Sequence, residues 1–230
     1  MKSFVSTIIF ALGLYQANAF NFDTELAGTK TKTHSCGCSK PATETREKIL
    51  AMSEANEARA VCVLKPAPGE VATGVVFFEQ TNMNSFVTYE GLIWNLTPGK
   101  EQGFHVHELG DMTDGCESLG SHYNPFGNDH GGPDDQNRHI GDLGNVQVDD
   151  QGTASFKKTD ELLELSGPFS IIGRSCIIHA GTDDLGKGGD EESLTTGNAG
   201  DRIGCGVIGL TNMNMEEYLA WLENPDAEEE

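Results

Sequence analysis

The chain has 230 residues, a formal net charge of −21 and a sequence pI near 4.5. A surface this acidic argues against binding to nucleic acid or to anionic membranes, because both are polyanions. The length suits one ordinary domain with extensions at its ends. An anionic substrate would therefore have to be attracted by positive charge close to its binding site.

The first 19 residues have the pattern of a secretory signal peptide. Lys2 precedes a short apolar run over residues 8–14, and Ala17-Asn18-Ala19 fits a cleavage site of small residues. The run is too short to span a bilayer. We expect a secreted chain that begins at Phe20, with no membrane partner. Loss of Lys2 removes one positive charge and no acid, so its net charge becomes −21 − 1 = −22.

Residues 20–58 read as an extension, because their apolar content is too small for an independent core. Good helix formers over residues 43–58 predict a short helix. The motif His34-Ser35-Cys36-Gly37-Cys38 leaves three interpretations open: a bridge between chains, a plain linker, or a soft-ligand site for Cu⁺. We predict that Cys36 and Cys38 bridge between chains, because one intervening residue strains an intrachain disulfide.

Residues 59–212 read as the main domain, and their pattern is that of an all-β protein. Val, Ile, Phe and Thr recur between Gly, Asp and Pro, which predicts strands at residues 60–65, 74–80, 85–96, 103–109, 144–149, 152–158, 170–180 and 204–210. The turn residues 149–152 predict a hairpin. Many short strands without helices between them indicate a β-sandwich or barrel. Asn95-Leu96-Thr97 is a sequon for glycosylation.

Residues 213–230 are predicted to form a C-terminal helix and an acidic tail. The helix has Met215, Tyr218, Leu219 and Leu222 at helical spacing. Asn214 is placed to cap it, with Glu217 reaching back. Because its polar face is acidic, we expect the helix to dock on its own barrel or on a partner subunit and not on a membrane.

Six of the seven histidines lie between residues 105 and 179. His105 and His107 are two apart in a predicted strand, so their side chains share a face. The long segments 111–142 and 180–202 lack apolar periodicity, and loops of that length are usually functional or disordered. The first is too polar to order itself by burial, but metal coordination would supply the missing free energy. Three histidines and one aspartate suit Zn²⁺, and four histidines suit copper.

The cysteines of the main domain divide into two kinds. Cys62 and Cys176 lie in apolar strand-like runs, so we expect buried free thiols. Cys116 lies in a loop and Cys205 opens an apolar strand, so these two cysteines could form a disulfide between the loop and the strand.

Four stretches together resemble the copper/zinc superoxide dismutases, in their secreted form. They are "GFHVHELGD", "GSHYNPFGNDHGGPDDQNRHIGDLGNV", "IIGRSCIIHAGTDDLGKGG" and "EESLTTGNAGDRIGCGVIG", in the family's order. The resemblance implies a flattened eight-stranded Greek-key barrel, an immunoglobulin-like sandwich with two long functional loops. It also implies a homodimer. Bridges between chains through Cys36 and Cys38 could link such dimers into higher oligomers.

The resemblance also implies site roles by motif. Copper would be held by His105, His107, His122 and His179, and zinc by His122, His130, His139 and Asp142. His122 would bridge the metals and take part in catalysis. Asp183 would orient one ligand of each metal, Arg202 would attract the substrate anion, and Cys116 and Cys205 would form the disulfide.

The implied activity is dismutation of superoxide to O₂ and H₂O₂ by alternate reduction and reoxidation of the copper. The chain departs from the family at two places. Thr195 occupies a position where a lysine that guides the anion is frequent in the family. Ala180 and Gly181 follow His179, where a basic residue is common. The alternative is a non-enzymatic extracellular carrier or copper-delivery protein on the same fold. Arg202 beside an open copper position favours the enzyme, because a carrier has no use for it.

Overall fold

The structure is a computed structural model that describes residues 57–82 and 85–224. The chain divides into two compact units, residues 1–40 and 41–230, and every described residue belongs to the second. The predicted signal peptide, the helix before residue 57, the Cys36–Cys38 motif and the acidic tail lie outside the described residues. None of the described helices is long and apolar enough to cross a lipid bilayer.

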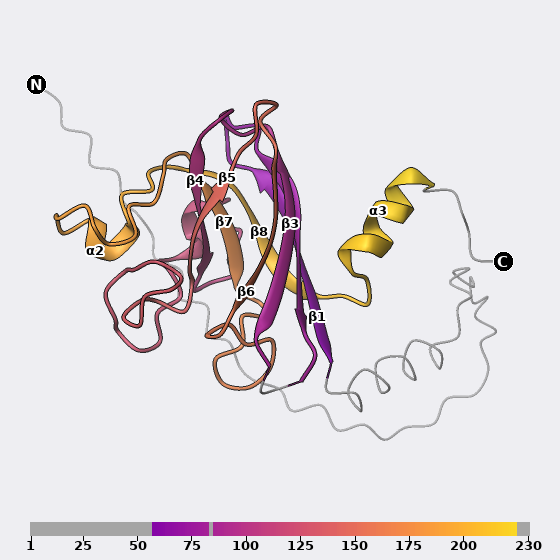
Figure 1. The fold of residues 1–230 in the computed structure, drawn as a ribbon, viewed down its shortest axis with the longest axis horizontal. Coiled ribbons are helices and arrows are strands. Elements are labelled where there is room, and N and C mark those ends of the chain that lie inside the picture. Colours follow the sequence, from indigo (N-terminus) through magenta and orange to yellow (C-terminus); the bar gives the residue numbers. More distant parts are fainter. Residues whose placement is uncertain (1–56, 83–84, 225–230) are drawn as a thin grey trace, which may run out of the picture. The chain divides into compact units, whose positions relative to one another are not determined.

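The predicted all-β fold is confirmed. All eight predicted strand segments form strands, namely β1 (Ala58–Pro66), β2 (Thr73–Gln80), β3 (Val87–Trp94), β4 (Glu101–His107), β5 (Asp142–Gln147), β6 (Ala154–Asp160), β7 (Ser175–His179) and β8 (Arg202–Leu210). The helical elements are the short η1 (Glu117–Leu119) and α2 (Ser193–Thr196) and the longer α3 (Met215–Glu223). The strand order β5-β4-β7-β8-β1-β2-β3-β6 makes a nearly closed antiparallel barrel (Figure 1).

The predicted hairpin at residues 149–152 is wrong. The turn is present, but it joins β5 to β6, which are the two edge strands of the sheet and form no ladder with each other. β5 pairs with β4 and β6 pairs with β3. The local turn signal was read correctly, but a turn does not determine which strands pair across it.

One core fills the barrel, and the side chains that line it alternate along the strands. On β1, Ala60, Cys62 and Leu64 point inward and are buried, as period-two alternation requires. On β4, Phe104 and Val106 pack into the same core. The residues between and beyond them, His105 and His107, therefore point to the opposite face, which the long loops cover.

A disulfide joins the first long loop to β8. Cys116 and Cys205 are bonded, as the family resemblance implied, and they pack with Ala67, Leu119 and Ile177 in a small second cluster. The predicted free thiols Cys62 and Cys176 are also found, both fully buried. The bond fixes the start of the loop against the barrel wall.

The C-terminal helix α3 docks on the outer face of its own barrel, the first of the two expected docking surfaces. Asn214 caps it with the predicted capping box, in which its side chain accepts from Glu217 N and the Glu217 side chain accepts from Asn214 N. Met215 and Tyr218 pack against Val75 and Phe77 of β2.

We predict that replacing Cys116 and Cys205 by alanine lowers the free energy of unfolding by about 4–5 kcal/mol in the chain-entropy model. The bond spans 89 residues of sequence, so its loss frees a large loop in the unfolded chain. Denaturant unfolding of the oxidised protein measures the change. A reductant should shift wild type toward the variant and leave the variant unmoved; equal stability of the two oxidised proteins would contradict the prediction.

Candidate metal centre

Two groups of metal-ligand side chains meet on the outer face of the barrel, where the long loops cover β4 and β7. One is His105, His107, His122 and His179, and the other is His122, His130, His139 and Asp142; all are buried, and within each group the ligand atoms lie within 4.8 Å of one another. These are the two sets predicted from the sequence, and His122 belongs to both. The rings of His105 and His122 are 4.1 Å apart between centroids.

The strands account for how the first group comes together. His105 pairs with Ile177 of β7 in the β4–β7 ladder, and His179 ends β7. The first long loop, which follows β4, returns to the end of that strand through an isolated bridge between His107 and His122. Two neighbouring strands of the sheet therefore bring three imidazoles together, and the loop bridged to β4 adds that of His122.

Each imidazole of the four-histidine group has one nitrogen held by the protein. His105 Nε2 lies 2.8 Å from Asp183 Oδ2, His107 Nδ1 lies 3.0 Å from Gly120 O, and His179 Nδ1 lies 3.0 Å from Gly200 O. The opposite nitrogens, His105 Nδ1, His107 Nε2 and His179 Nε2, are buried without a hydrogen-bond partner. Buried polar atoms are rarely left unpaired, so these three nitrogens fit the donor set of a metal ion.

The second group converges on one carboxylate oxygen. Asp142 Oδ1 lies 2.8 Å from His122 Nδ1, 2.9 Å from His130 Nδ1 and 3.0 Å from His139 Nδ1. The contact with His130 Nδ1 lacks the geometry of a hydrogen bond, and that nitrogen is also without a partner. Three imidazole nitrogens and one carboxylate are a complete tetrahedral set for Zn²⁺.

The electrostatics keep the four-histidine group neutral in the metal-free protein. Burial, followed by the neighbouring His122, holds the pKa values of His105 and His107 well below the usual range. Burial also lowers the pKa of His122, and it lowers that of His179 to about 4 despite the hydrogen bond to Gly200. A metal binds neutral imidazole, so His105, His107 and His179 need lose no proton before binding.

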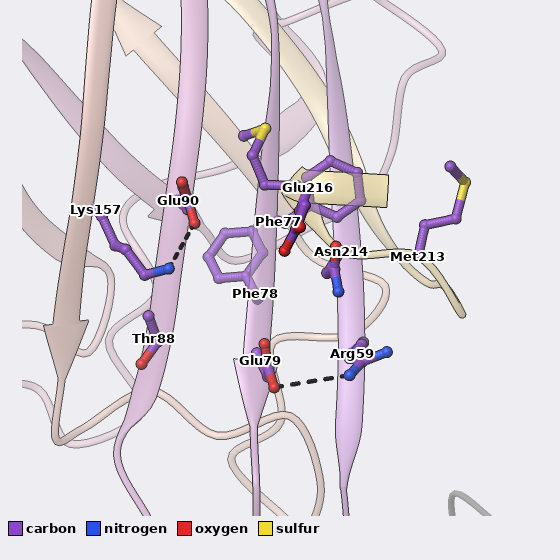
Figure 2. Close-up of a pocket in the computed structure, with 11 residues that line it drawn as sticks. Arg59, Phe77, Phe78, Glu79, Thr88, Glu90, Lys157, Met213, Asn214 and Glu216 are labelled. Carbon is purple, nitrogen blue, oxygen red and sulfur yellow. Dashed lines mark hydrogen bonds and ion pairs between the residues drawn. The ribbon is translucent and has the colours of Figure 1, made fainter. Parts of the chain in front are cut away.

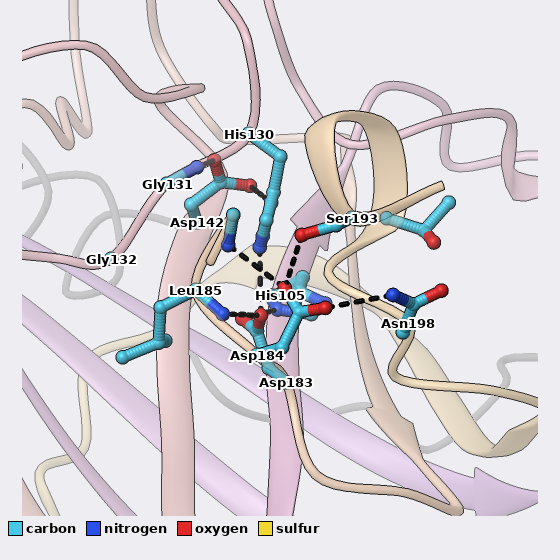
Figure 3. A network of polar contacts seen from close by, with 12 residues as sticks. His105, His130, Gly131, Gly132, Asp142, Asp183, Asp184, Leu185, Ser193 and Asn198 are labelled. Atoms are coloured by element: carbon cyan, nitrogen blue, oxygen red, sulfur yellow. Dashed lines mark hydrogen bonds and ion pairs between the residues drawn. The ribbon is translucent and has the colours of Figure 1, made fainter. Parts of the chain in front are cut away.

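The carboxylate of Asp183 connects the two groups. Its Oδ2 lies 2.8 Å from His105 Nε2 and its Oδ1 lies 2.8 Å from His130 Nε2 (Figure 3). Burial opposes protonation of His130, but the carboxylates of Asp142 and Asp183 prevail and raise its pKa to about 9. One side chain thus fixes the ring orientation of a residue from each group.

Asp183 is itself held by a residue that the sequence patterns did not reveal. Asn145 Oδ1 accepts from Asp183 N and Asn145 Nδ2 donates to Asp183 O, both at 2.8 Å. The next residue, Asp184, accepts from Ser193 Oγ and Asn198 Nδ2 at 2.7 Å each (Figure 3). Asn145 lies in β5 three residues after Asp142, but an asparagine is not a typical metal ligand, so the spacing of the ligands gave no signal for it.

Arg202 lies at the border of the four-histidine group. Its Nη1 donates to Cys116 O at 2.6 Å and its Nη2 donates to Gly120 O at 2.7 Å. Gly120 O is also the partner of His107 Nδ1, and the charge of Arg202 contributes to the lowered pKa of His107. The disulfide at Cys116 therefore helps to hold the guanidinium beside the histidines.

Two other predicted residues belong to neither ligand group: Thr195 is exposed on α2, and Asn95 is exposed between β3 and β4. The Cys36–Cys38 motif lies outside the described residues. Asn95 has a positive φ of 63°, and its Nδ2 donates to Val71 O at 3.1 Å.

Comparison with known proteins decides the family. The family model described as copper/zinc superoxide dismutase matches residues 72–208. The chain belongs to the copper/zinc superoxide dismutase family. Similar curated proteins named "Superoxide dismutase [Cu-Zn]" come from Candida glabrata (56% identical over 156 residues), Saccharomyces cerevisiae (54% over 154) and Cordyceps militaris (51% over 157). Each is matched over 99% of its length by 67% of this chain.

Family membership gives copper and zinc as the cofactors, and the donor set fits both. The imidazole-only group matches the preference of copper, and the group with Asp142 matches that of zinc. The remaining third of the chain has no counterpart in these relatives, which are already matched almost completely.

We predict that Asp183→Ala weakens binding of both metals by about 10–100-fold, because His105 and His130 each lose the group that orients the ring. Competition with a chelator, read separately for copper and zinc, measures the two affinities. Asp134→Asn, on the exposed part of the loop, is the control and should change neither. A loss confined to one metal would show that Asp183 does not couple the groups.

We also predict that the metal-free protein loses stability as the pH falls from about 6.5 to about 4. In this interval the unfolded chain protonates its histidines at their ordinary pKa of 6.5, while His105, His107 and His179 stay neutral in the fold. The unfolded state then binds more protons, so stability declines with pH. His130, with its raised pKa, is protonated in both states below pH 6.5 and adds nothing there.

The shift of His179 alone corresponds to a loss of about 3 kcal/mol across this interval, to order of magnitude. Urea unfolding of the metal-free protein between pH 7.5 and pH 4 measures it. Unchanged stability over the interval would contradict the assignment of neutral buried rings.

Proposed function

We propose that this chain dismutates superoxide as a secreted copper/zinc enzyme, with His122 and Arg202 as its catalytic residues. The reaction converts two superoxide ions and two protons to O₂ and H₂O₂. The observation that carries the proposal is the pair of donor groups that share His122, with Arg202 at the border of the four-histidine group. A carrier would need the ligands but not the arginine.

Copper supplies the one-electron redox chemistry, which zinc lacks because it has no accessible redox couple. The protein's part is to position the substrate and the proton. Arg202 is permanently charged, and its two carbonyl partners fix the direction of its planar fork, which suits a small oxyanion. His122 has its Nδ1 on the side of Asp142, so its other nitrogen is the one that can take up a proton and deliver it to the product.

Secretion rests on the residues before the barrel. The signal-peptide pattern of residues 1–19 is the support, together with the extension that the curated relatives lack. On this proposal the domains are the signal peptide, an extension over residues 20–58, the dismutase domain over residues 59–212, and a C-terminal helix with its tail. A bridge through Cys36 and Cys38 would then form in an oxidising compartment.

Two further features are proposed with secretion. A homodimer is supported by exposed apolar side chains on adjacent strands, with Val63 on β1 at 56% exposure and Val207 on β8 at 39%. Glycosylation at Asn95 is supported by its exposure, although a glycan there would have to replace the hydrogen bond to Val71 O.

The proposed function is tested on protein recovered from the medium of cells that express the full chain. We predict that its N-terminus is Phe20, that it contains one copper and one zinc per chain, and that it dismutates superoxide. His122→Ala should uncouple the two metals, so that removing zinc no longer perturbs the copper spectrum. An intact Met1 would refute secretion. Bound metals without dismutation would favour the carrier.

We predict that the dismutation rate falls weakly as salt rises. The net charge repels superoxide, but most acidic groups should lie farther from the copper than the Debye length of about 8 Å at physiological ionic strength. The attraction by Arg202 is local and is screened less, so it dominates. Thr195→Lys adds a cation on α2, and should raise the rate and steepen the salt dependence. Arg202→Glu should lower the rate at least about tenfold and reverse the slope.

Stopped-flow rates at several ionic strengths measure this effect. A wild-type rate that rises with added salt would show that the global negative charge governs the approach of the anion.

A further inference from the structure

The C-terminal helix α3 covers the barrel with only part of its apolar stripe. Met215, in its first turn, is 5% exposed and packs with Phe77 of β2. Leu219 and Leu222 continue the same stripe at helical spacing, yet they are 40% and 44% exposed. Trp221, whose ring stacks on Tyr218, is 50% exposed. The later turns of α3 therefore present an apolar face that no described residue covers.

A cavity of about 240 Å³ lies where α3 begins. Phe77 and Met213 are among the apolar residues that line it (Figure 2). Charged side chains form its rim, among them Arg59 at the start of β1 and Glu216 in the first turn of α3. The cavity adjoins the point where the chain enters β1, because Arg59 lines it.

The chain that precedes β1 is tethered beside both features. Arg59 O accepts from Thr211 N at 3.1 Å, and Ala60 pairs with Leu210, so the start of β1 lies against the segment that leads into α3. Met52 and Ile49 precede Glu57 by five and eight residues. Fully extended, such a tether reaches at most roughly 16–29 Å, and as the predicted helix it reaches about 8–12 Å, while α3 with its nine residues is about 13 Å long. Even the helical tether is thus comparable in length to α3.

The same segment can supply apolar side chains to α3. It carries Ile49, Leu50 and Met52 close together. Its charges balance, since Arg46 and Lys48 are matched by Glu47 and Glu54, so attraction to the three glutamates of α3 does not decide the contact. The apolar side chains would meet the uncovered stripe of α3.

We propose that residues 46–56 of the same chain pack along α3 and bury Leu219, Trp221 and Leu222 against Ile49, Leu50 and Met52. The contact is intramolecular because a tether this short gives an effective concentration in the millimolar range, which a second copy does not match in dilute solution. The two extensions thereby form a clasp on the outer face of the barrel, outside residues 72–208 that the family model matches.

Tryptophan fluorescence tests the clasp directly, since the chain has only Trp94 and Trp221. In the full secreted chain carrying Trp94→Phe, Trp221 is the single reporter. We expect blue-shifted emission and weak acrylamide quenching. Adding Ile49→Ser, Leu50→Ser and Met52→Ser should shift the emission to the red and raise the quenching constant about twofold, because Trp221 is half exposed once the segment leaves.

Matched controls separate the clasp from general effects. Ser53→Ala in the same segment, and Phe86→Ser at an exposed apolar side chain before β3, should leave the quenching constant unchanged. Dismutase activity should be the same in all variants, because none of these residues belongs to the two ligand groups. Equal quenching with and without the three serines would overturn the proposal.

A mixing experiment tests whether the segment that packs on α3 belongs to the same chain or to a second copy. The triple-serine reporter is incubated with an excess of full chain that lacks both tryptophans (Trp94→Phe, Trp221→Phe). The proposal expects no recovery of protection. If protection returns, the segment comes from a neighbouring copy, and the intramolecular clasp is wrong.

Discussion

The structure depends on buried imidazole rings in which only one of the two nitrogens has a hydrogen-bond partner in the protein. His105, His107 and His179 each have one nitrogen anchored by the protein and the other buried without a partner. A buried unpaired polar atom costs on the order of 1–3 kcal/mol, so three at one point are a substantial destabilisation in the metal-free state. Metal coordination removes that cost, and the same free energy then orders the loops that supply the remaining ligands.

The loops are held by carboxylates in place of a hydrophobic core. Asp183 links His105 and His130, and Asp184 ties the loop to Ser193 and Asn198. His130 N donates to Leu194 O, which connects the zinc group to α2. Because these bonds share residues with the ligand set, loss of metal and loss of loop order should occur together. The disulfide at Cys116 adds a covalent anchor on the side of Arg202.

Much of the fold and the ligand set was predictable because it depends on local patterns. Runs of β-forming residues between Gly, Asp and Pro placed all eight strands, and the spacing of His105 and His107 put both on one face of their strand. The pairing of strands was not local, so the turn at residues 149–152 was misread as a hairpin. Asn145 and the carbonyl of Gly120 were also missed, since backbone acceptors and a lone asparagine acquire their roles only in three dimensions.

The role of α3 follows from a feature of β2 that period-two alternation does not explain. Val75, Val76, Phe77 and Phe78 are apolar at four consecutive positions, so both faces of this strand must be covered. Val76 and Phe78 face the barrel core, while Val75 and Phe77 face outward and pack with Met215. A strand of a single barrel with a solvated outer face would carry polar residues at those two positions. The outward Val75 and Phe77 therefore tie the C-terminal extension to the barrel, and α3 forms part of the folded domain.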